Sequence, residues 1–527
     1  MAAISALKSS PKEPLSGSSV FIDEKFDVVV HELEMKGWTR CPFQSSRCDL
    51  IWTNLARIDW KKVTSSQVVN HFRGSQHLSN KSFLAFHMAA CGKENHMPLQ
   101  WSAAYQDLAE LLSMVTLCTI YGSCLALLEG EGEADISERI SEVNTLLRVL
   151  DMDPDTAQSS SIQSAKLLLA AMKENKDMGA ALRSVEEDSN SGLYLSRSLV
   201  GSKGMWIIKE VGSSCGRGIS ICSGVRELLK VVESMNFKCV VQKYLERPLL
   251  LRDRRKFDIR QWILVKSLDP LVILGYSEFY CRLSKREYDL APEHFDDPAM
   301  HLCNHAVQKA VDGGTRQDKS PPLTAEEEER RCDTMMNQTE FEEHLLSLNP
   351  PVSLQASLLP QIKQAAVDAV GSVTSSLSAL GGHSFEWLGL DLMVMEDMTV
   401  RLIEVNVSPD VSRSTPITAR LVKGAVSELL PIVLEGERWN SRKDGSSSDS
   451  KWEQWWPSEG LLPSGEEETP GQARQGSPNA PRSLSADYSP KKKAVFDRAV
   501  SSLHMSIGVA SGQDANHGAA SDSEDEL

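Results

Sequence analysis

The sequence predicts an α+β protein with mainly antiparallel sheets, flanking helices and a disordered C-terminal tail. Residues 205–283 contain short runs of β-branched and aromatic residues separated by turns, such as MWIIK, KCVVQKYL and FDIRQWILV. Residues 101–182 instead show the apolar spacing of helices, interrupted at GEGEAD and DMDPDTAQSSS. After about Glu437 the composition changes to Ser, Gly, Pro and charged residues, which is typical of disorder.

These changes in composition divide the 527 residues into seven segments. GGTRQDKSPPLTAEEEERR is charged and contains prolines, so a surface insertion is expected there. The expected segments are a disordered N-terminus (1–20), an N-terminal domain (21–100), a helical variable region (101–204), a central domain (205–310), the surface insertion (311–345), a C-terminal domain (346–436) and a disordered acidic, Ser-rich tail (437–527).

The composition bounds the class of protein. Lys and Arg number 56 against 72 Asp and Glu, and the formal charge of −16 argues against nucleic acid as a partner. The 11 cysteines are scattered without CxxC spacing and no signal peptide precedes them, which predicts a cytoplasmic protein. Leu111 to Leu128 contains no charged residue and has the length of a membrane span, but polar residues dilute it and acids flank it. We therefore expect a buried core helix and no membrane.

Two acidic residues lie inside the apolar strands of GLDLMVMEDMTVRLIEVN, Gly389 to Asn406. If the turn is centred between Asp397 and Met398, antiparallel pairing places Asp391 directly opposite Glu404. Asn406, two residues further on, then points to the same face. Like charges opposite one another destabilise a sheet, so the arrangement requires a positive charge between them.

A divalent cation would supply that charge. All three side chains offer oxygen donors, which Mg²⁺ prefers and zinc or copper does not. Three ligands are too few for an all-protein cage, so substrate phosphates would complete the shell. The alternative is a half-exposed hairpin with a mispaired pair of acids.

Two further segments suggest a nucleotide site. KEVGSSCGRGIS, Lys209 to Ser220, follows the strand MWII, and its glycines could bring backbone N–H groups against phosphate oxygens. It is not a Walker A loop, and a simple glycine-rich turn is the alternative. In RRKFDIRQWILV, Asp258 and Arg260 share one face of a strand, which indicates either a solvated surface or the wall of a site.

HLCNH, His301 to His305, has a histidine pair at i and i+4 around Cys303. A structural zinc site normally needs four ligands, and no second cluster lies at usable spacing. We expect Asn304 and His305 to present hydrogen-bonding groups to a site instead.

Taken together and in this order, these segments resemble the tubulin tyrosine ligase-like family, whose members have an ATP-grasp fold. The matching stretches are WIIK with SSCGRGI, VVQKYLERPLLL, KFDIRQWILV, HLCNHAVQK and FEWLGLDLMV with RLIEVNVSP. VNHFRGSQHLSNKSFL resembles the stretch that carries the family's early site lysine, here Lys81. The resemblance runs from about Phe21 to about Leu434 and is densest over 205–310 and 384–421.

The resemblance implies roles for individual residues. ATP would be bound by Lys209 at the phosphates, by Cys215 and Gly216 in the closing loop, by Gln242, Lys243, Tyr244 and Leu245 at the adenine, by Lys256, Phe257 and Asp258 on the adenine and ribose side, and by Cys303 and Asn304 at the junction with the substrate. The γ-phosphate or the incoming carboxylates would meet Arg260 and Arg282, with Lys81 as the third catalytic residue. Mg²⁺ would be held by Asp391, Glu404 and Asn406.

The implied reaction is ATP-dependent ligation through an acyl phosphate, in which the amine of a free amino acid displaces phosphate. The segments EVNVSPDVSRSTPITARL, HLCN and AVQK are most similar to the glycine-adding branch, which modifies glutamate side chains of tubulin tails. QKYLERPLLL with RKFDIRQWILV is closer to tyrosine ligase, so tyrosine or glutamate as donor remains the alternative. A monomer is expected that works on microtubules, in the cytoplasm and in the cilium or flagellum.

Two features qualify the resemblance. Glu210 stands where most members have proline after the loop lysine, and a usual segment before the central domain is missing. A non-catalytic, nucleotide-binding tubulin adaptor is therefore a further alternative. Because tubulin tails are acidic, we also predict a local basic surface that includes Arg247, Arg252, Arg254 and Arg255.

Overall fold

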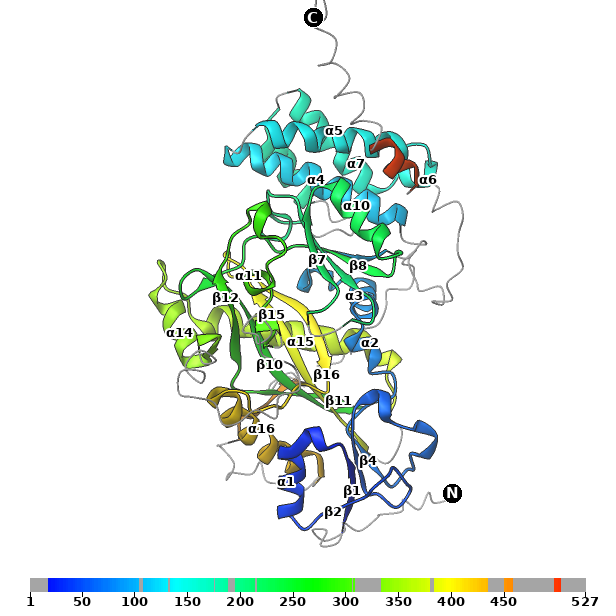
Figure 1. Cartoon of the computed structure of the whole chain (residues 1–527), viewed down its shortest axis with the longest axis vertical. Coiled ribbons are helices and arrows are strands. Elements are labelled where there is room, and N and C mark those ends of the chain that lie inside the picture. The colour runs from blue at the N-terminus through cyan, green and yellow to red at the C-terminus, as the bar shows by residue number, and fades with distance from the viewer. Residues whose placement is uncertain are drawn as a thin grey trace, which may run out of the picture.

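The computed structural model describes residues 18–103, 108–130, 133–174, 176–187, 195–213, 216–305, 307–308, 333–379, 383–434, 450–457 and 497–503. A small N-terminal sheet lies at one end of the molecule, the largest sheet lies in the middle, and a helical part with a four-stranded sheet lies at the other end (Figure 1). The predicted combination of helices with mainly antiparallel sheets is confirmed.

The N-terminal sheet is parallel throughout, unlike the other two. Its strands run in the order β14 (His383–Ser384), β4 (Val68–Val69), β3 (Leu50–Trp52), β1 (Ser19–Ile22) and β2 (Thr39–Arg40). The strand β14 comes from the C-terminal half of the chain. Helix α1 (Asp27–Met35) packs against α16 (Pro416–Leu434), so this sheet is joined to the C-terminal domain by backbone pairing and by a shared core.

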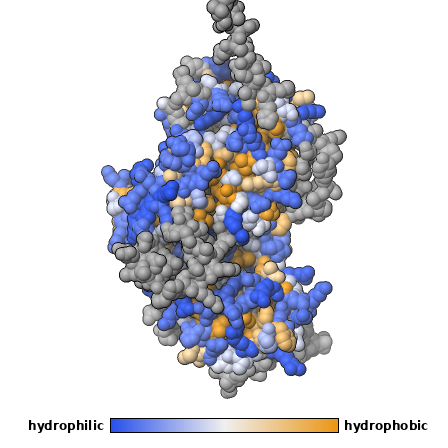
Figure 2. All heavy atoms as spheres, in the orientation of Figure 1, coloured by the Kyte–Doolittle hydropathy of each residue, from blue (hydrophilic) through white to orange (hydrophobic). Residues whose placement is uncertain are grey.

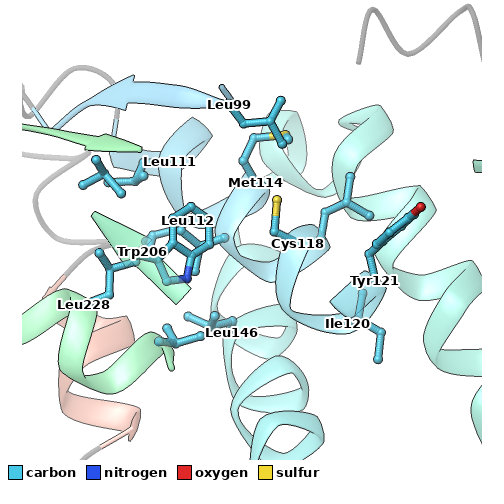
Figure 3. Close-up of a cluster of buried hydrophobic side chains, with 14 of the residues drawn as sticks. Leu99, Leu111, Leu112, Met114, Cys118, Ile120, Tyr121, Leu146, Trp206 and Leu228 are labelled. Atoms are coloured by element: carbon cyan, nitrogen blue, oxygen red, sulfur yellow. The ribbon is translucent and has the colours of Figure 1, made fainter. Parts of the chain in front are cut away.

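The four-stranded antiparallel sheet has the order β5 (Gln100–Ser102), β8 (Cys239–Lys243), β6 (Met205–Glu210) and β7 (Ile219–Ser223). One face is covered by α10 (Val225–Ser234) and α4 (Leu108–Glu129); Figure 3 shows Trp206 of β6 among side chains of α4 and α10. The other helices of this part are α5 (Glu133–Leu150), α6 (Pro154–Ala157), α7 (Ser160–Lys173), α8 (Met178–Glu186) and α9 (Arg197–Val200).

Helix α4 is long and apolar enough to cross a membrane, and it is the one such helix within the described ranges. In the fold 89% of its most apolar window is buried, between the four-stranded sheet and α5 and α7. A helix that is apolar on all sides needs such a position, because it has no face for water. The expected buried core helix is confirmed.

The largest sheet is antiparallel and is built around β10 (Arg255–Leu268). This long strand pairs along its length with β12 (Tyr280–Glu287), β15 (Glu386–Val394), β11 (Leu271–Tyr276) and β9 (Leu250–Leu251); β13 (Met335–Asn337), β16 (Val400–Val407) and β17 (Trp452–Trp456) extend it. Helix α15 (Leu359–Val373) covers one face and α16 the other, each over its own hydrophobic core.

Short helices complete the fold. They are η1 (Glu24–Phe26), η2 (Leu55–Arg57), η3 (Trp60–Lys62), α2 (Gln76–Ser79), α3 (Lys81–Ala90), η4 (Glu94–His96), η6 (Pro292–His294), α11 (Pro298–His301), α14 (Gln338–Ser347), the π-helical turn η7 (Leu354–Leu358) and η8 (Thr374–Ser376).

Three predicted boundaries are wrong. The central domain (205–310) spans two sheets, because β6 to β8 form the small sheet whereas β10 to β12 pair with the predicted C-terminal domain. Strand β5 crosses the expected boundary at residue 100 and joins β8. The predicted insertion (311–345) includes β13 and α14, which belong to the largest sheet and its core; residues 311–332 lie outside the described part.

The prediction of a disordered tail from residue 437 also needs correction. Strand β17 pairs with β11, and Trp452 and Trp455 are buried on opposite faces of the sheet. Residues 497–503 form a helix, drawn in red in Figure 1, which buries Ala499 and Leu503 in the core of the helical part. The rest of the tail, like residues 1–17, lies outside the described residues.

Candidate functional site

The acidic hairpin is formed by β15 and β16, and Asp391 faces Glu404 as predicted. The turn is centred on Asp397, one half-residue earlier than expected, and the register shifts by one at Ile403. This bulge restores the predicted pairing, because without it Asp391 would face Ile403. Asn406 lies on the same face, with its Nδ2 3.3 Å from Oε1 of Glu404. The three predicted metal ligands therefore lie side by side.

The positive charge that the two acids require comes from side chains of the chain itself. Arg260 of β10 donates to both oxygens of Asp391, from Nε at 2.5 Å and from Nη2 at 3.2 Å. Arg282 of β12 approaches the same carboxylate with Nη2 at 2.8 Å. The Nζ of Lys81 is 2.8 Å from Oε2 of Glu404. Lys81, assigned to the site by resemblance, is thus brought to the hairpin from the N-terminal part of the chain.

Asp258, Arg260, Arg282 and Asp391 form a buried quartet of two acids and two arginines. Strand pairing places them together, since β12 and β15 flank β10 and present these residues at matching positions. Arg282 also holds Asp258 with two hydrogen bonds of 2.6 and 2.8 Å. Burial would raise the pKa of Asp391, but the guanidinium groups of Arg260 and Arg282 outweigh burial and hold that pKa well below its usual range. The quartet is neutral as a whole, which makes its burial tolerable.

Lys209, near the end of β6, is buried, and it contacts no acidic side chain among the residues that the structure describes. Its Nζ donates to Oε1 of Gln242 at 2.6 Å, and the amide of Gln242 donates to Gln100 at 2.8 Å. Burial, and after it the positive charge of Lys81, lower the pKa of Lys209 to about 7. An anionic ligand would stabilise the charged form of a lysine in this environment. Gln100 was missed, because a lone glutamine on a short strand gives no sequence signal.

A second lysine, Lys256, lies beside an apolar cluster. The cluster includes Ile207, Ile221, Tyr244, Tyr288 and Leu302. Figure 2 shows hydrophobic residues gathered on this face, at the height where Figure 1 labels β7 and α11. The Nζ of Lys256 donates to the hydroxyl of Tyr244 at 2.8 Å and lies 4.2 Å from the centre of its ring. Apolar side chains with a polar group at their edge are the kind of lining that suits a nucleotide base.

His301 contacts Tyr244. Burial and the charge of Lys256 lower the pKa of His301 to about 4, so the ring is neutral at physiological pH. Because Lys256 donates to the Tyr244 hydroxyl, that hydroxyl donates to Nδ1 of His301 at 2.9 Å, and Nε2 donates to the carbonyl of His294 at 3.0 Å. His301 thereby holds the segment with Cys303 and Asn304 beside Tyr244 and Lys256. Across the described residues no three His, Cys, Asp or Glu are arranged for a metal ion.

Three residues predicted to bind nucleotide have their side chains outside the apolar cluster beside Lys256. Lys243 is buried against Glu246 at 2.6 Å and the carbonyl of Met205 at 2.7 Å, and Leu245 lies in the core of the helical part. Phe257 packs on Phe341 in the core under the largest sheet. Neighbouring residues on a strand alternate between its faces, so the side chains of Gln242, Tyr244, Lys256 and Asp258 cannot share a face with them.

The glycine-rich loop lies close to the 301–308 segment. A Cβ on Gly216 would come within 2.2 Å of a methyl group of Val307, so the approach requires glycine. Cys215 lies outside the described residues. Glu210 is turned into its own loop, where it accepts a hydrogen bond from Ser213 at 2.7 Å. The glycine-rich loop, predicted to offer backbone amides to phosphate, thus neighbours the segment with Cys303 and Asn304, predicted to lie at the junction with the substrate.

The predicted basic surface is wrong. Arg255 is buried and makes two bonds to Asp333, at 2.9 and 3.0 Å. The three others also have acidic partners: Arg247 pairs with Glu129 and Glu396, Arg252 with Glu340, and Arg254 with Glu287. Runs of arginine in a sequence do not reveal which acids fold against them.

The oxygen donors at the hairpin fit a hard divalent cation in number and type. Glu404 and Asn406 are partly exposed and in contact, whereas Asp391 is buried with both oxygens held by arginines. Two accessible donors and one shared carboxylate suit Mg²⁺, which usually keeps several water or phosphate ligands.

Comparison with the sequences of known proteins identifies related chains. The sequence profile described as the tubulin-tyrosine ligase family matches residues 146–441, more than half of the chain. The chain is 34% identical over 241 residues to tubulin monoglycylase TTLL3 of Homo sapiens and 32% identical over 241 residues to tubulin glycylase 3A of Drosophila melanogaster. It is 35% identical over 240 residues to protein monoglycylase TTLL8 of Homo sapiens. Each match covers 45% of this chain and 23% to 29% of the relative.

Proposed function

Because this chain belongs to the tubulin-tyrosine ligase family, we propose that it is an ATP- and Mg²⁺-dependent ligase with an ATP-grasp fold that adds glycine to glutamate side chains of tubulin tails. The nucleotide would lie between the four-stranded sheet and the largest sheet. The reaction would take place in the cytoplasm, on microtubules and in cilia or flagella.

One observation carries the proposal. Three lysines from separate segments, Lys81, Lys209 and Lys256, converge near the acidic hairpin, and burial, followed by the charges of the two other lysines, lowers the pKa of Lys209. Buried like charges cost free energy, and a protein that keeps them gains when an anion arrives. A polyphosphate is such an anion, and the apolar cluster next to Lys256 would contact its base.

The residues of the chain would divide the chemistry as follows. Lys209 would bind the transferred phosphoryl group, while Tyr244 and Lys256 orient the base side. Asp391, Glu404 and Asn406 would hold Mg²⁺, which when bound supplies charge neutralisation for the phosphates. The substrate carboxylate attacks the γ-phosphorus with loss of ADP; the glycine amine then attacks the acyl carbon, phosphate leaves, and the amine loses a proton.

Arg260 and Arg282 need a change of partner for their proposed role. Both are neutralised by the quartet as it stands, with Asp391 shared between them. If Asp391 took part in metal binding, N–H groups of Arg260 and Arg282 that now donate to it would be free to bind an incoming carboxylate or the γ-phosphate. Charge-assisted bonds of this kind stabilise a developing anion most strongly in a water-poor site.

Glycine is proposed as the donor because the relatives named above are glycylases. Tyrosine or glutamate ligation by the same mechanism remains the alternative. A non-catalytic adaptor is the second alternative, for which Glu210 was the reason. The carboxylate of Glu210 accepts a hydrogen bond from Ser213 within its own loop, whereas Lys209 donates to Gln242. Glu210 is therefore not the partner of Lys209, and this weakens the adaptor alternative.

The test is a ligation assay on the full chain with ATP, Mg²⁺, tubulin and one labelled amino acid at a time. We expect label from glycine on tubulin, with release of ADP and phosphate. Glu404→Gln should lower the rate at least ~100-fold, the scale seen when one stabilising group is lost from an anionic transition state.

Glu453→Gln is the matched control, because Glu453 lies on β17 at the far edge of the sheet and pairs with Lys363. It should leave the rate unchanged. Labelling by tyrosine or glutamate instead of glycine would replace the donor in the proposal. No labelling by any amino acid, with nucleotide still bound, would favour the adaptor.

A further inference from the structure

A buried histidine–carboxylate pair lies at the open end of the β15–β16 hairpin. Nδ1 of His71 is 2.5 Å from Oε1 of Glu386, and the two side chains are 1% and 0% exposed. His71 follows β4 in the N-terminal part, whereas Glu386 begins β15, the strand that carries Asp391. The pair therefore connects two parts of the chain 315 residues apart, beside the proposed metal ligands.

Glu386 has donors on both oxygens. Its Oε2 accepts hydrogen bonds from the amide of Phe72 at 3.1 Å and from the hydroxyl of Ser75. A fully buried carboxylate costs several kcal/mol unless it is paired in this way. The segment that contains His71, Phe72 and Ser75 is thus wrapped around one carboxylate of β15.

The other nitrogen of His71 reaches the second strand of the hairpin. Nε2 lies 2.9 Å from the carbonyl oxygen of Thr53 and 3.0 Å from Oγ of Ser408. His71 thus links the carboxylate of Glu386 on one side of its ring to the oxygen atoms of Thr53 and Ser408 on the other. Ser408 comes two residues after Asn406.

The backbone at Ser408 has φ of +59°, in the left-handed region. This conformation costs a non-glycine residue roughly 1–2 kcal/mol, so surrounding contacts must hold it. The contact with His71 is one of them. His71 therefore contacts both strands of the hairpin at the end where Asn406 lies.

The same short segment reaches the hairpin a second time. After α2 the side chain of Asn80 caps α3, accepting from the amides of Ser82 and Phe83 at 3.0 and 3.2 Å. Lys81 is the first residue of α3, and its Nζ meets Glu404. Residues 71–81 are thus fixed to the hairpin at both ends.

We propose that His71, held by Glu386, is a positioning residue that sets the place of Asn406 through Ser408 and the place of Lys81 through α2. It touches no reacting atom. The consequence for Mg²⁺ and ATP rests on the proposed function, whereas the hold on the hairpin does not.

Hydrogen exchange on the full chain tests the hold directly. Ser408→Ala removes the hydroxyl and keeps the buried contact between His71 and Glu386, and Ser408→Gly in addition relieves the positive φ. We expect both variants, and His71→Gln, to exchange amides 404–410 at least ~10-fold faster than the unchanged protein, with β6 and β8 unaffected. Ser372→Ala is the control, because its hydroxyl is also buried but bonds only Ala369 within α15. Unchanged exchange at 404–410 in all three variants would overturn the proposal.

Mg²⁺ titration of ATP binding tests the consequence. Loss of a residue that orients a metal ligand typically weakens metal affinity 10–100-fold, so we expect Ser408→Ala and Ser408→Gly to raise the Mg²⁺ concentration needed by ~10–100-fold. If these variants melted at a lower temperature than the unchanged protein but needed the same Mg²⁺ concentration, the contact between His71 and Ser408 would be structural only. This result too would overturn the proposal. If the unchanged protein bound no ATP at any Mg²⁺ concentration, the proposed function would fail, and the exchange result alone would decide on His71.

Discussion

The side-chain nitrogen of Lys209 lies 2.6 Å from the amide oxygen of Gln242, while the carboxylate of Glu404 at the hairpin is paired with Lys81. A buried lysine with a neutral partner sheds its proton readily, and burial together with Lys81 lowers its pKa to about 7. The charge of Lys209, the proposed phosphate-binding lysine, therefore depends on whether an anion is present.

Nucleotide binding should therefore be accompanied by proton uptake. At pH 8 Lys209 is mostly neutral in the free protein, and phosphate oxygens beside it would raise its pKa, so ~1 proton should be taken up per nucleotide. Calorimetry in buffers of different ionisation enthalpy measures this number. Lys209→Arg, which stays charged at all accessible pH values, is the matched control and should take up none. A binding enthalpy that does not depend on the buffer would contradict the prediction.

The same lysine should make the folded protein less stable below pH 7. Its pKa is about 7 when folded and about 10.4 when unfolded, so the unfolded chain binds more protons between these values. The penalty is complete below pH 7 and falls to zero only above the unfolded pKa of about 10.4. Lys209→Met should hence raise the free energy of unfolding at pH 6.5 by roughly 4 kcal/mol, and most of this difference should be gone near pH 10. Urea unfolding at several pH values checks this; an equal difference at all pH values would mean that packing, and not charge, is responsible.

The facing acids could be predicted from the sequence because hairpin pairing is local. Asp391 and Glu404 are separated by one turn, and alternation along two strands fixes their positions. Alternation also shows that Lys243 and Leu245 cannot share a face with Gln242 and Tyr244, a distinction that resemblance to a family does not make.

The partners of those acids could not be predicted, because they arrive from distant strands. Arg260 is 131 residues from Asp391, and nothing local links β10 to β15. The sequence required a positive charge between the acids, and the structure shows that arginines and a lysine supply it. Strand β17 was missed for a different reason: five residues, WEQWW, are hidden by the average composition of a polar tail.

Arg282 should be necessary for stability, because it pairs with two buried acids. Arg282→Ala leaves Asp258 without its partner and Asp391 with one fewer, and breaking a buried pair typically costs about 3–5 kcal/mol. Urea unfolding measures the loss. Arg254→Ala is the control: Arg254 is 72% exposed beside Glu287 and should change stability by less than ~1 kcal/mol.

A double variant tests whether the loss comes from unpaired charge. Asp258→Asn combined with Arg282→Met removes one acid and one arginine together and keeps similar volume, so part of the lost stability should return. Strictly additive losses would show that the two residues do not act as a pair.

Strand β17 should be part of the folded protein and not of a dispensable tail. Trp455 is 6% exposed and lies against Gly275 of β11, where a Cβ would come within 1.9 Å of the indole ring. Trp455→Ala should cost about 3–5 kcal/mol, as for other buried tryptophans. Phe43→Ala is the control, because Phe43 is 66% exposed and makes no comparable core contact.

Truncation separates the contribution of the strand from that of the rest of the tail. A chain that ends at residue 449 leaves the edge of β11 unpaired, so it should melt earlier and aggregate more than a chain that ends at 457. The chain that ends at 457 keeps β17 but loses the helix at 497–503, which buries Ala499 and Leu503, and should lose a smaller part of its stability in the helical end. Thermal melting and light scattering compare the two. Equal melting temperatures for both truncations would mean that β17 does not stabilise the sheet, and the polar composition of the tail would then be the better guide to residues 450–457.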